Sequence, residues 1–322
     1  MKLAFITDPI HQLDPCHDTS VALMEAAQIL GHEIWVTEAS MLSVIDSKAW
    51  GMLRQIELIP VLLVEKGWIA VNPWYRLSDP CFTSLEAMDA VFMRTDPPIN
   101  DSYLYATYVL DYIDPQKTLV VNRPSGIRGA NEKMYALQFT NAIPETIVSA
   151  DKQLIWEFVE AKGAAIIKPL GNKAGEGILF LQPSDRNFNS IVELSTMRGR
   201  LPVMVQTYLP AAKEGDKRII LLNGEPIGAL NRLASGIDFR NNMAAGGTVA
   251  QTKITPREHE ICAEIGATLR QDGLVFVGID VIGGYLTEVN VTSPTGIREI
   301  DRLEVTRLGE QVISWISHTL KN

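Results

Sequence analysis

Apolar and polar positions alternate in blocks along the first part of the chain. Residues 2–7 (KLAFIT) form an apolar run typical of a buried first strand. Asp18 or the threonine after it can cap a helix whose apolar positions continue to Leu30, and Gly31 stands at the usual stop position. Residues 32–38 (HEIWVTE) then read as a second strand. The pattern predicts a βαβ unit.

Two further apolar runs, at 89–94 and 118–122, predict more strands of the same sheet. We expect this sheet to be mainly parallel and to form an N-terminal α/β domain over residues 1–122. The run from Arg94 to Pro98 ends its strand at a rigid turn, which is either a plain chain reversal or a ligand-binding loop. No glycine fingerprint follows the first strand, so a dinucleotide site is not expected here.

A glycine-rich loop lies between two apolar strands within residues 164–182. Lys168 stands where the first strand ends, and the loop holds Gly171, Gly175 and Gly177. Glycines let a backbone approach phosphate oxygens closely, and the lysine supplies a countercharge. The loop is therefore a candidate flap over phosphates, although a plain flexible turn has the same composition. It is not a Walker A loop, which needs Gly-Lys-Ser/Thr opening a helix.

Two segments beside this loop are further candidates for nucleotide contacts. Residues 131–133 (NEK) are expected to open a helix, where Lys133 either meets a phosphate or is merely solvated. Residues 201–211 (LPVMVQTYLPA) read as a strand that runs out into an extended linker. If this segment joins two lobes, the backbone of residues 206–209 offers one C=O and one N–H to the edge of an adenine ring. The alternative is an ordinary buried strand.

Asn223-Gly224 is the strongest short hairpin signal in the sequence. It lies between two apolar runs that begin near Arg218 and end near Arg232. Because the strands of a hairpin return on themselves, the two arginines are expected to lie near each other in space. Surface arginines are usually solvated, but two at one end of a hairpin in an acidic protein favour a site for anions.

Residues 235–247 carry small residues around Arg240 and show no periodicity. We interpret them as a substrate loop, and a disordered connection is the alternative. Thr255-Pro256-Arg257-Glu258 is a capping box with proline at the first helical position. It predicts a helix over 256–271.

The chemistry concentrates in a hairpin near the C-terminus. Glu288 and Asn290 are two residues apart, so on a strand they project from the same face. A three-residue connection at 283–285 aligns the polar faces of both strands and sets Asp280 opposite Glu288, whereas a two-residue Gly-Gly turn does not. Two facing carboxylates repel each other unless a cation lies between them. These oxygens suit Mg²⁺; the alternative is an exposed edge hairpin with ordinary surface carboxylates.

Composition narrows the class of protein. With 322 residues and 46% hydrophobic content, the chain is long enough for two or three subdomains. A net charge of −9 and no basic stripe argue against a nucleic-acid partner. Three distant cysteines predict neither a disulfide framework nor a zinc site and fit a reducing cytosol. The apolar runs are too short to span a bilayer, so we expect no membrane partner and a cytoplasmic location.

Taken together, these segments resemble the ATP-grasp fold, and more closely the prokaryotic glutathione synthetase family. The matching segments occur in the family's order and cover nearly the whole chain: MRTDPP, LVVNRP, NEK, IIKPL, GDKR, MAAGG, LVFVGIDVIG and LTEVNVTSPTGIREI. The resemblance implies an α/β architecture of α+β lobes: an N-terminal Rossmann-like parallel-sheet domain (1–122), a central ATP-grasp subdomain with the flap (123–200) and a C-terminal subdomain with the metal site and substrate loop (201–322).

The resemblance also implies a role for each candidate residue. Nucleotide-binding residues would be Lys133, Lys168, Gly171, Gly175, Gly177, Gln206, Thr207, Tyr208, Leu209 and Asp216; ligands of Mg²⁺ (or Mn²⁺) would be Asp280, Glu288 and Asn290; Arg218, Arg232 and Arg240 would act in catalysis; and Arg94, Ser293, Pro294 and Thr295 would border the peptide. The chain departs from the family pattern at Thr95, where a basic residue is expected, and in a flap that is less dense in glycine.

The reaction implied is the MgATP-dependent ligation of γ-glutamylcysteine and glycine through an acyl phosphate, by a homo-oligomer (dimer or tetramer). A carboxylate is a poor electrophile, and phosphorylation activates it. No nucleophilic triad is needed, and none stands out in the sequence. A sibling ATP-grasp ligase with another acid or amine, and a non-catalytic ATP-binding protein, are the alternatives.

Overall fold

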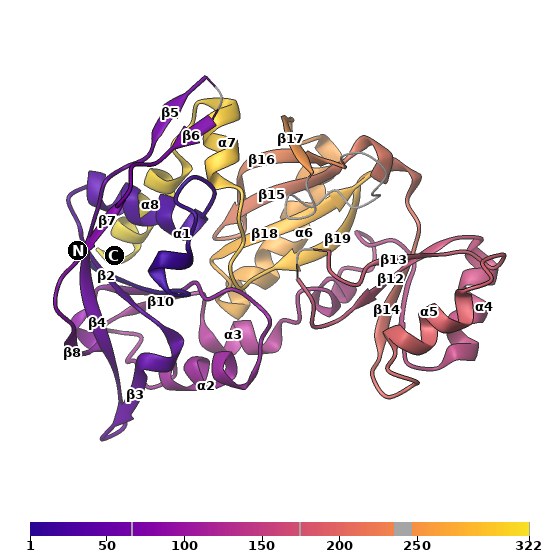
Figure 1. Ribbon diagram of the computed structural model, residues 1–322, viewed down its shortest axis with the longest axis horizontal. Helices are drawn as coiled ribbons and strands as arrows, with labels where there is room; N and C mark the ends of the chain where they lie inside the picture. Colours follow the sequence, from indigo (N-terminus) through magenta and orange to yellow (C-terminus); the bar gives the residue numbers. More distant parts are fainter. Residues whose placement is uncertain (66, 174, 235–246, 322) are drawn as a thin grey trace.

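The computed structural model describes residues 1–65, 67–173, 175–234 and 247–321. Three sheets organise these residues (Figure 1). The first sheet has the order β10 (Leu119–Val121), β9 (Ala90–Met93), β1 (Lys2–Ile6), β2 (Glu33–Thr37), β4 (Lys48–Leu58) and β3 (Leu42–Ile45), with β7 (Tyr75–Leu77) and β8 (Cys81–Ser84) also paired to β4. The parallel strands β10, β9, β1 and β2 confirm the expected sheet. The antiparallel strands within residues 42–84 were not anticipated.

Strand β1 is buried on both faces, which explains its continuous apolar run. Leu3 and Phe5 pack in one core with α1 (Thr19–Ile29) and α8 (Leu308–Thr319). Ala4 and Ile6 pack in a second core with α2 (Asp101–Leu110) and α3 (Pro124–Gly129). Asp18 caps α1 as expected, because its side chain accepts a hydrogen bond from the N–H of Val21. The C-terminal helix thus returns to the N-terminal sheet.

The second sheet forms a separate lobe, drawn at the right of Figure 1. Its order is β11 (Thr146–Ser149), β14 (Val203–Thr207), β12 (Ala165–Pro169) and β13 (Leu179–Leu181). The helices α4 (Lys152–Lys162) and α5 (Phe188–Ser195) cover it and share its core, whose members include Ile155, Val192 and Val205. This core is a cluster of its own, distinct from the two cores of the first sheet.

The third sheet has the order β17 (Thr248–Gln251), β16 (Glu225–Leu233), β15 (Asp216–Leu222), β18 (Phe276–Ile282) and β19 (Tyr285–Asn290). Its two faces belong to the same two cores as the first sheet: Ile219 lies in one and Ile220 in the other. The expected Asn223-Gly224 hairpin is present, with both residues at positive φ. The first and third sheets therefore form one packed body, and the second sheet forms a separate lobe beside it.

The β18–β19 hairpin reaches the expected pairing by an unexpected route. Asp280 lies opposite Glu288, as predicted, but Ile282 pairs with Tyr285, so the turn has two residues and not three. A β-bulge between Asp280 and Val281 of β18, opposite the additional residue Thr287, restores the alignment of the polar faces. The expectation of a three-residue connection was wrong because a bulge is invisible to a count of alternating positions.

The remaining elements connect these layers. They are η1 (Ile10–Gln12), η2 (Ala39–Met41), η3 (Leu85–Ala87), η4 (Met134–Gln138), η5 (Pro210–Glu214), the hairpin of β5 (Leu62–Val64) and β6 (Gly67–Ile69), α6 (Pro256–Asp272) and α7 (Ile297–Glu304). The capping box of α6 is confirmed, with Thr255 and Glu258 bonded reciprocally. The helix expected from residues 131–133 is only the short 3-10 segment η4. None of the described helices is long and apolar enough to cross a membrane.

Candidate functional site

The second and third sheets enclose a cleft, here called the first cleft, that gathers most of the predicted nucleotide residues. It is lined by Lys133, Ile166, Lys168, Asn172, Gly175, Glu176, Ile178, Gln206, Thr207, Tyr208, Leu209, Ala212, Asp216, Asp280, Ile282, Thr287 and Glu288. One wall comes from β12, the following turn and β14, and the other from β15, β18 and β19. Among the predicted nucleotide residues, Gly171 and Gly177 are not part of this lining, although they belong to the same glycine loop as Gly175.

Lys168 is a partly buried cation of the second-sheet wall. Its Nζ donates to Oε1 of Gln206 at 2.7 Å. Burial lowers the pKa of Lys168, and the nearby carboxylate of Glu288 acts in the opposite direction. Within the described residues, Nε2 of Gln206 has no hydrogen-bond partner. An anion in the cleft would favour the charged form of this ammonium further.

The segment expected to contact adenine already uses part of its backbone in hydrogen bonds within the protein. The N–H of Thr207 donates to Glu145 O at 3.0 Å, and the N–H of Tyr208 donates to Ala164 O at 3.1 Å. These two donors are therefore already in use, and a ligand at this segment would use its other backbone groups. The apolar lining beside it, from Ile166, Ile178, Leu209 and Ile282, suits a flat ring.

The glycine loop has a left-handed backbone at two of its glycines. Gly175 and Gly177 both have positive φ, and a Cβ on Gly177 would lie 2.8 Å from Cγ of Pro169. Asn172 presents its carbonyl oxygen to Nζ of Lys133 at 2.7 Å. The loop is thus tied to the opposite wall through one lysine.

The arginines of β15 and β16 meet at one buried carboxylate. Nη2 of Arg218 and Nη2 of Arg232 each lie 3.0 Å from Oδ2 of Asp280. Arg232 also binds Oδ2 of Asp216 at 2.6 Å. Arg218, Arg232 and Asp280 are less than a tenth exposed. The anion site expected for the two arginines is therefore occupied, in this structure, by the protein's own aspartates.

Burial and charge set the pKa values of these aspartates in opposite directions. Burial alone would raise the pKa of Asp280, but Arg218 and Arg232 hold it well below its usual range. Burial raises the pKa of Asp216 to about 6 against the lowering effect of Arg232. Arg218 and Arg232 thus place protein cations beside Asp280, and a metal ion at these oxygens stays a prediction.

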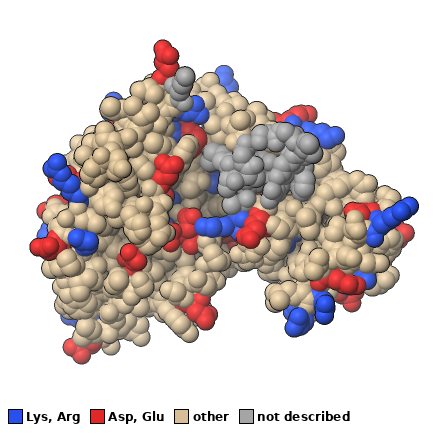
Figure 2. Space-filling model, in the orientation of Figure 1, with Lys and Arg blue, Asp and Glu red and all other residues tan. Residues whose placement is uncertain are grey.

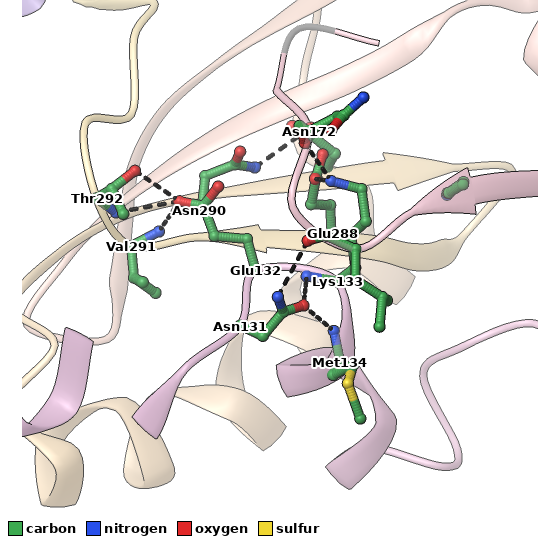
Figure 3. Close-up of polar contacts among 12 residues, drawn as sticks. Asn131, Glu132, Lys133, Met134, Asn172, Glu288, Asn290, Val291 and Thr292 are labelled. Atoms are coloured by element: carbon green, nitrogen blue, oxygen red, sulfur yellow. Dashed lines mark hydrogen bonds and ion pairs between the residues drawn. The ribbon is translucent and has the colours of Figure 1, made fainter. Parts of the chain in front are cut away.

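Glu288 and Asn290 are the members of the oxygen set that do not bind the two arginines in the described residues. Oε1 of Glu288 lies 3.1 Å from Nζ of Lys133 (Figure 3). Nδ2 of Asn290 donates to Oδ2 of Asp280 at 3.3 Å. A carboxylate and an amide oxygen suit a hard divalent cation. In the part of the chain that the structure describes, no three His, Cys, Asp or Glu side chains gather as a metal site by themselves. Substrate oxygens would have to complete such a site.

The predicted substrate residues meet across the first and third sheets. The buried Arg94 donates from Nε to Oγ of Ser20 and from Nη2 to the carbonyl of Pro294, both at 3.0 Å. Its Nη1 has no hydrogen-bond partner among the described residues. Nη1 of Arg218 donates to the carbonyl of Thr295 at 3.2 Å. Two arginines therefore fix the 293–295 turn through its carbonyl groups.

A second cleft adjoins this turn at the carboxyl ends of β1, β2 and β9. Its lining includes Asp8, Asp18, Arg94, Asp96, Lys173 and Thr295. In Figure 2, acidic and basic side chains cross the middle of this face, where the right-hand lobe meets the rest of the molecule. Nζ of Lys173, in the glycine loop, lies 2.9 Å from Oδ2 of Asp96. The loop of the first cleft thus reaches the rim of the second.

Glu132 contacts the site although the sequence analysis gave it no role. Its carboxylate accepts hydrogen bonds from Val291 and Thr292, immediately after Asn290 (Figure 3). The only sequence signal was its position between Asn131 and Lys133. Arg240, with residues 235–246, lies outside the described residues, so the geometry does not bear on its predicted role.

Two family models match the chain. The prokaryotic glutathione synthetase N-terminal domain matches residues 1–128, and the prokaryotic glutathione synthetase ATP-grasp domain matches residues 132–305.

Curated relatives agree with these matches along the whole length. The chain is 79% identical to a glutathione synthetase of Nostoc sp. over 321 residues, covering 100% of this chain and 99% of the relative. It is 63% identical to a glutathione synthetase of Thermosynechococcus vestitus, covering 98% and 99%. More distant relatives include a glutathione synthetase of Prochlorococcus marinus that is 40% identical over 98% of each chain.

Solved structures with the same fold are more distant in sequence. A D-cycloserine synthetase has a TM-score of 0.67 and 14% identity, covering 99% of this chain and 100% of the other. The ATP-grasp ligase PsnB, complexed with a minimal precursor, Mg and ADP, has a TM-score of 0.63 and 14% identity, covering 100% and 98%. At such identities the likeness shows the fold alone, and it confirms the expected ATP-grasp architecture.

Proposed function

The chain belongs to the prokaryotic glutathione synthetase family, and we propose that it joins γ-glutamylcysteine to glycine while ATP is converted to ADP and phosphate. It is an ATP-dependent carboxylate-amine ligase. The observation that carries the proposal is the first cleft, in which two lysines face an oxygen-rich hairpin beside two buried arginines. Phosphoryl transfer needs positioning and charge neutralisation more than a nucleophile, and this cleft offers both.

ATP would lie in the first cleft with its ring between Ile166, Ile178 and Ile282. The segment 206–209 would contact the adenine edge, and Asp216 would face the nucleotide with the carboxylate oxygen that has no partner among the described residues. Lys168 and Lys133 would hold the phosphates, under the glycines 171, 175 and 177. Support comes from the ammonium of Lys168, which lies in the lining of the cleft and donates to Gln206.

Glu288 and Asn290 would hold the divalent cation, Mg²⁺ or Mn²⁺, together with phosphate oxygens. Asp280 would share in this site only through a carboxylate that already binds Arg218 and Arg232. When bound, the cation neutralises charge on the transferring phosphoryl group. The ammonium of Lys133 lies 3.1 Å from the Glu288 carboxylate. It would move from this carboxylate to the phosphates of the bound nucleotide.

The dipeptide would lie in the second cleft, with its reacting carboxylate near Arg218 and Arg232. Arg94 would bind a substrate oxygen with the Nη1 that has no partner among the described residues, and Ser293, Pro294 and Thr295 would form the border of the site. Arg240 would belong to the loop that covers the peptide.

The ligation proceeds in two displacements. An oxygen of the dipeptide's carboxylate attacks the γ-phosphorus of ATP and releases ADP, which gives an acyl phosphate. The glycine amine, having lost a proton, then attacks the acyl carbon and expels phosphate. Arg218 and Arg232 stabilise the negative charge that develops in both steps, and a closed loop keeps water from the acyl phosphate.

The deciding experiment is product analysis with γ-glutamylcysteine, glycine and MgATP. We expect glutathione and ADP in a one-to-one ratio, with neither formed when the dipeptide is omitted. Replacing Mg²⁺ by Mn²⁺, or adding a chelator, tests the cation. ADP release with other acids or amines, but none with γ-glutamylcysteine, would contradict the proposed substrate and favour a sibling ligase.

We further propose a division of the chain into a domain of residues 1–122 and ATP-grasp subdomains of residues 123–200 and 201–322. A homo-oligomer, either a dimer or a tetramer, and a cytoplasmic location complete the proposal. The free cysteines Cys16, Cys81 and Cys262 support a reducing compartment. Light scattering tests the oligomeric state.

A further inference from the structure

Strand β19 is at the edge of the third sheet, so its outer N–H groups need partners from outside the sheet. Glu132 supplies a partner to one of them and another to the first N–H after the strand. The N–H of Val289 donates to its backbone carbonyl at 2.9 Å, and the N–H of Val291 donates to its side-chain Oε1 at 2.9 Å. One residue thus acts as a substitute for a neighbouring strand.

The same carboxylate oxygen makes two further contacts with the next residue along the chain. Oε1 of Glu132 also accepts the N–H of Thr292 at 3.1 Å and the Oγ1 hydroxyl of Thr292 at 2.8 Å (Figure 3). Three donors therefore converge on one oxygen. Val291 and Thr292 connect Asn290 to Ser293, so the carboxylate fixes the short link between the two parts of the site.

The residues on both sides of Glu132 contact the same region. Lys133 lies against Glu288, and Nδ2 of Asn131 donates to the carbonyl of Leu170 at 3.0 Å, at the base of the glycine loop. The tripeptide 131–133 thus touches the edge strand, the link after it and the glycine loop. Of the three residues, Glu132 alone binds this region with both its backbone and its side chain: the carbonyl accepts from β19, and the carboxylate accepts from Val291 and Thr292.

We propose that Glu132 is a positioning residue, which holds Glu288 and Asn290 toward the first cleft and the 293–295 turn toward the second. This inference rests on the proposed function of the two clefts. The three side-chain hydrogen bonds hold Val291 and Thr292, which connect Asn290 to Ser293, so loss of the side chain would disturb cation binding and dipeptide binding together. The proposed lining of the adenine ring, Ile166, Ile178 and Ile282, is not among the residues that Glu132 hydrogen-bonds and would not be disturbed.

The test compares the parent with Glu132→Ala, Glu132→Gln and Thr292→Val. The glutamine keeps an acceptor oxygen, and the valine removes only the hydroxyl donor. Asp301→Ala is the matched control, because Asp301 also accepts one backbone N–H, from Leu308, and one threonine hydroxyl, from Thr306, both at 2.9 Å. Each variant is measured for Mn²⁺ binding in the presence of ADP, metal-free ADP binding, the KM of the dipeptide and the melting temperature.

We expect Glu132→Ala to weaken Mn²⁺ binding and to raise the KM of the dipeptide, each by about tenfold, as for the loss of an outer partner of a metal ligand. Metal-free ADP binding stays unchanged. Glu132→Gln restores most of both values, and Thr292→Val raises the dipeptide KM by about threefold through the loss of one hydrogen bond. Asp301→Ala lowers the melting temperature without changing either value.

Parent-like Mn²⁺ binding and dipeptide KM in folded Glu132→Ala would overturn the inference. If that variant does not fold, an unchanged dipeptide KM in Thr292→Val has the same meaning. The Mn²⁺ titration uses no acceptor substrate, so it decides the inference even if the parent chain makes no glutathione. Failure of the proposed function and failure of the positioning role are therefore distinguishable.

Discussion

The two walls of the first cleft are built in opposite ways. On the third-sheet wall, Arg218, Arg232 and Asp280 are buried and bonded to one another across three neighbouring strands. On the second-sheet wall, the glycine loop carries charges such as Lys173, whose side chain is 42% exposed and whose partner Asp96 is 46% exposed. A preorganised wall stabilises developing charge, whereas a loop with exposed contacts can open and close at little cost. The comparison predicts that equal charge changes have unequal effects on the two walls.

Asp280→Asn should have the largest effect. Removing the charge leaves two buried guanidinium groups without full compensation, so we expect a loss of about 3 kcal/mol in the free energy of unfolding. Ligase activity should fall as well, because both arginines would be released from their positions. Denaturant unfolding and steady-state kinetics measure the two effects.

The matched control for Asp280→Asn is Glu193→Gln, which removes the carboxylate of the exposed pair with Lys152. Its cost should stay below about 1 kcal/mol. An Asp280→Asn protein as stable as its parent would mean that the third-sheet wall is not preorganised by this network.

Lys168→Ala should weaken ATP binding strongly and leave the fold intact. Burial already disfavours the ammonium of Lys168, so its removal costs little stability. A lost hydrogen bond between charged groups is worth about 1.5–3 kcal/mol, which predicts a loss of at least about tenfold in ATP affinity. Calorimetry beside a thermal melt measures both. Lys162→Ala, at the ion pair with Glu145, is the control that should bind ATP normally; unchanged ATP affinity in Lys168→Ala would remove this lysine from the site.

Lys173→Ala should have the smallest effect. An exposed ion pair contributes about 0.2–1 kcal/mol, so we expect the KM of the dipeptide to rise by no more than about fivefold and the melting temperature to stay constant. Lys173→Arg should restore the parent value. A large drop in melting temperature would show that the loop is a packed part of the lobe and would reverse the contrast between the walls.

Local signals in the sequence were sufficient for the elements that carry the site. The cap at Asp18, the capping box at Thr255 and the Asn223-Gly224 turn each depend on a few neighbouring residues, and all three are present. The proximity of Arg218 and Arg232 followed from the same turn. Hydrophobic alternation also predicted that Asp280 lies opposite Glu288.

Contacts between distant segments could not be predicted in this way. Arg218 lies opposite Asp280 because β15 pairs with β18, which is separated from it by α6 and residues 235–246 among others. No local pattern shows that the arginines already hold an aspartate. Local patterns also could not show the contacts of Glu132, because its partners Val291 and Thr292 are 159 and 160 residues away in the sequence. The resemblance to a family supplied roles for residues, but not the hydrogen bonds that orient them.

The β-bulge that Thr287 forms opposite Asp280 and Val281 decides where β19 can gain or lose a residue. Thr287 is the additional residue of β19, so a chain without it would still set Ile282 opposite Tyr285 and Asp280 opposite Glu288. What such a chain would lose is the hydroxyl that donates to the carbonyl of Asp280 at 3.2 Å, and a side chain in the first cleft. Loss or gain of one residue after Glu288 would instead move Asn290 to the other face of the strand. Within six residues of one strand, the hairpin therefore has one position where chain length can vary and a neighbouring part where it cannot.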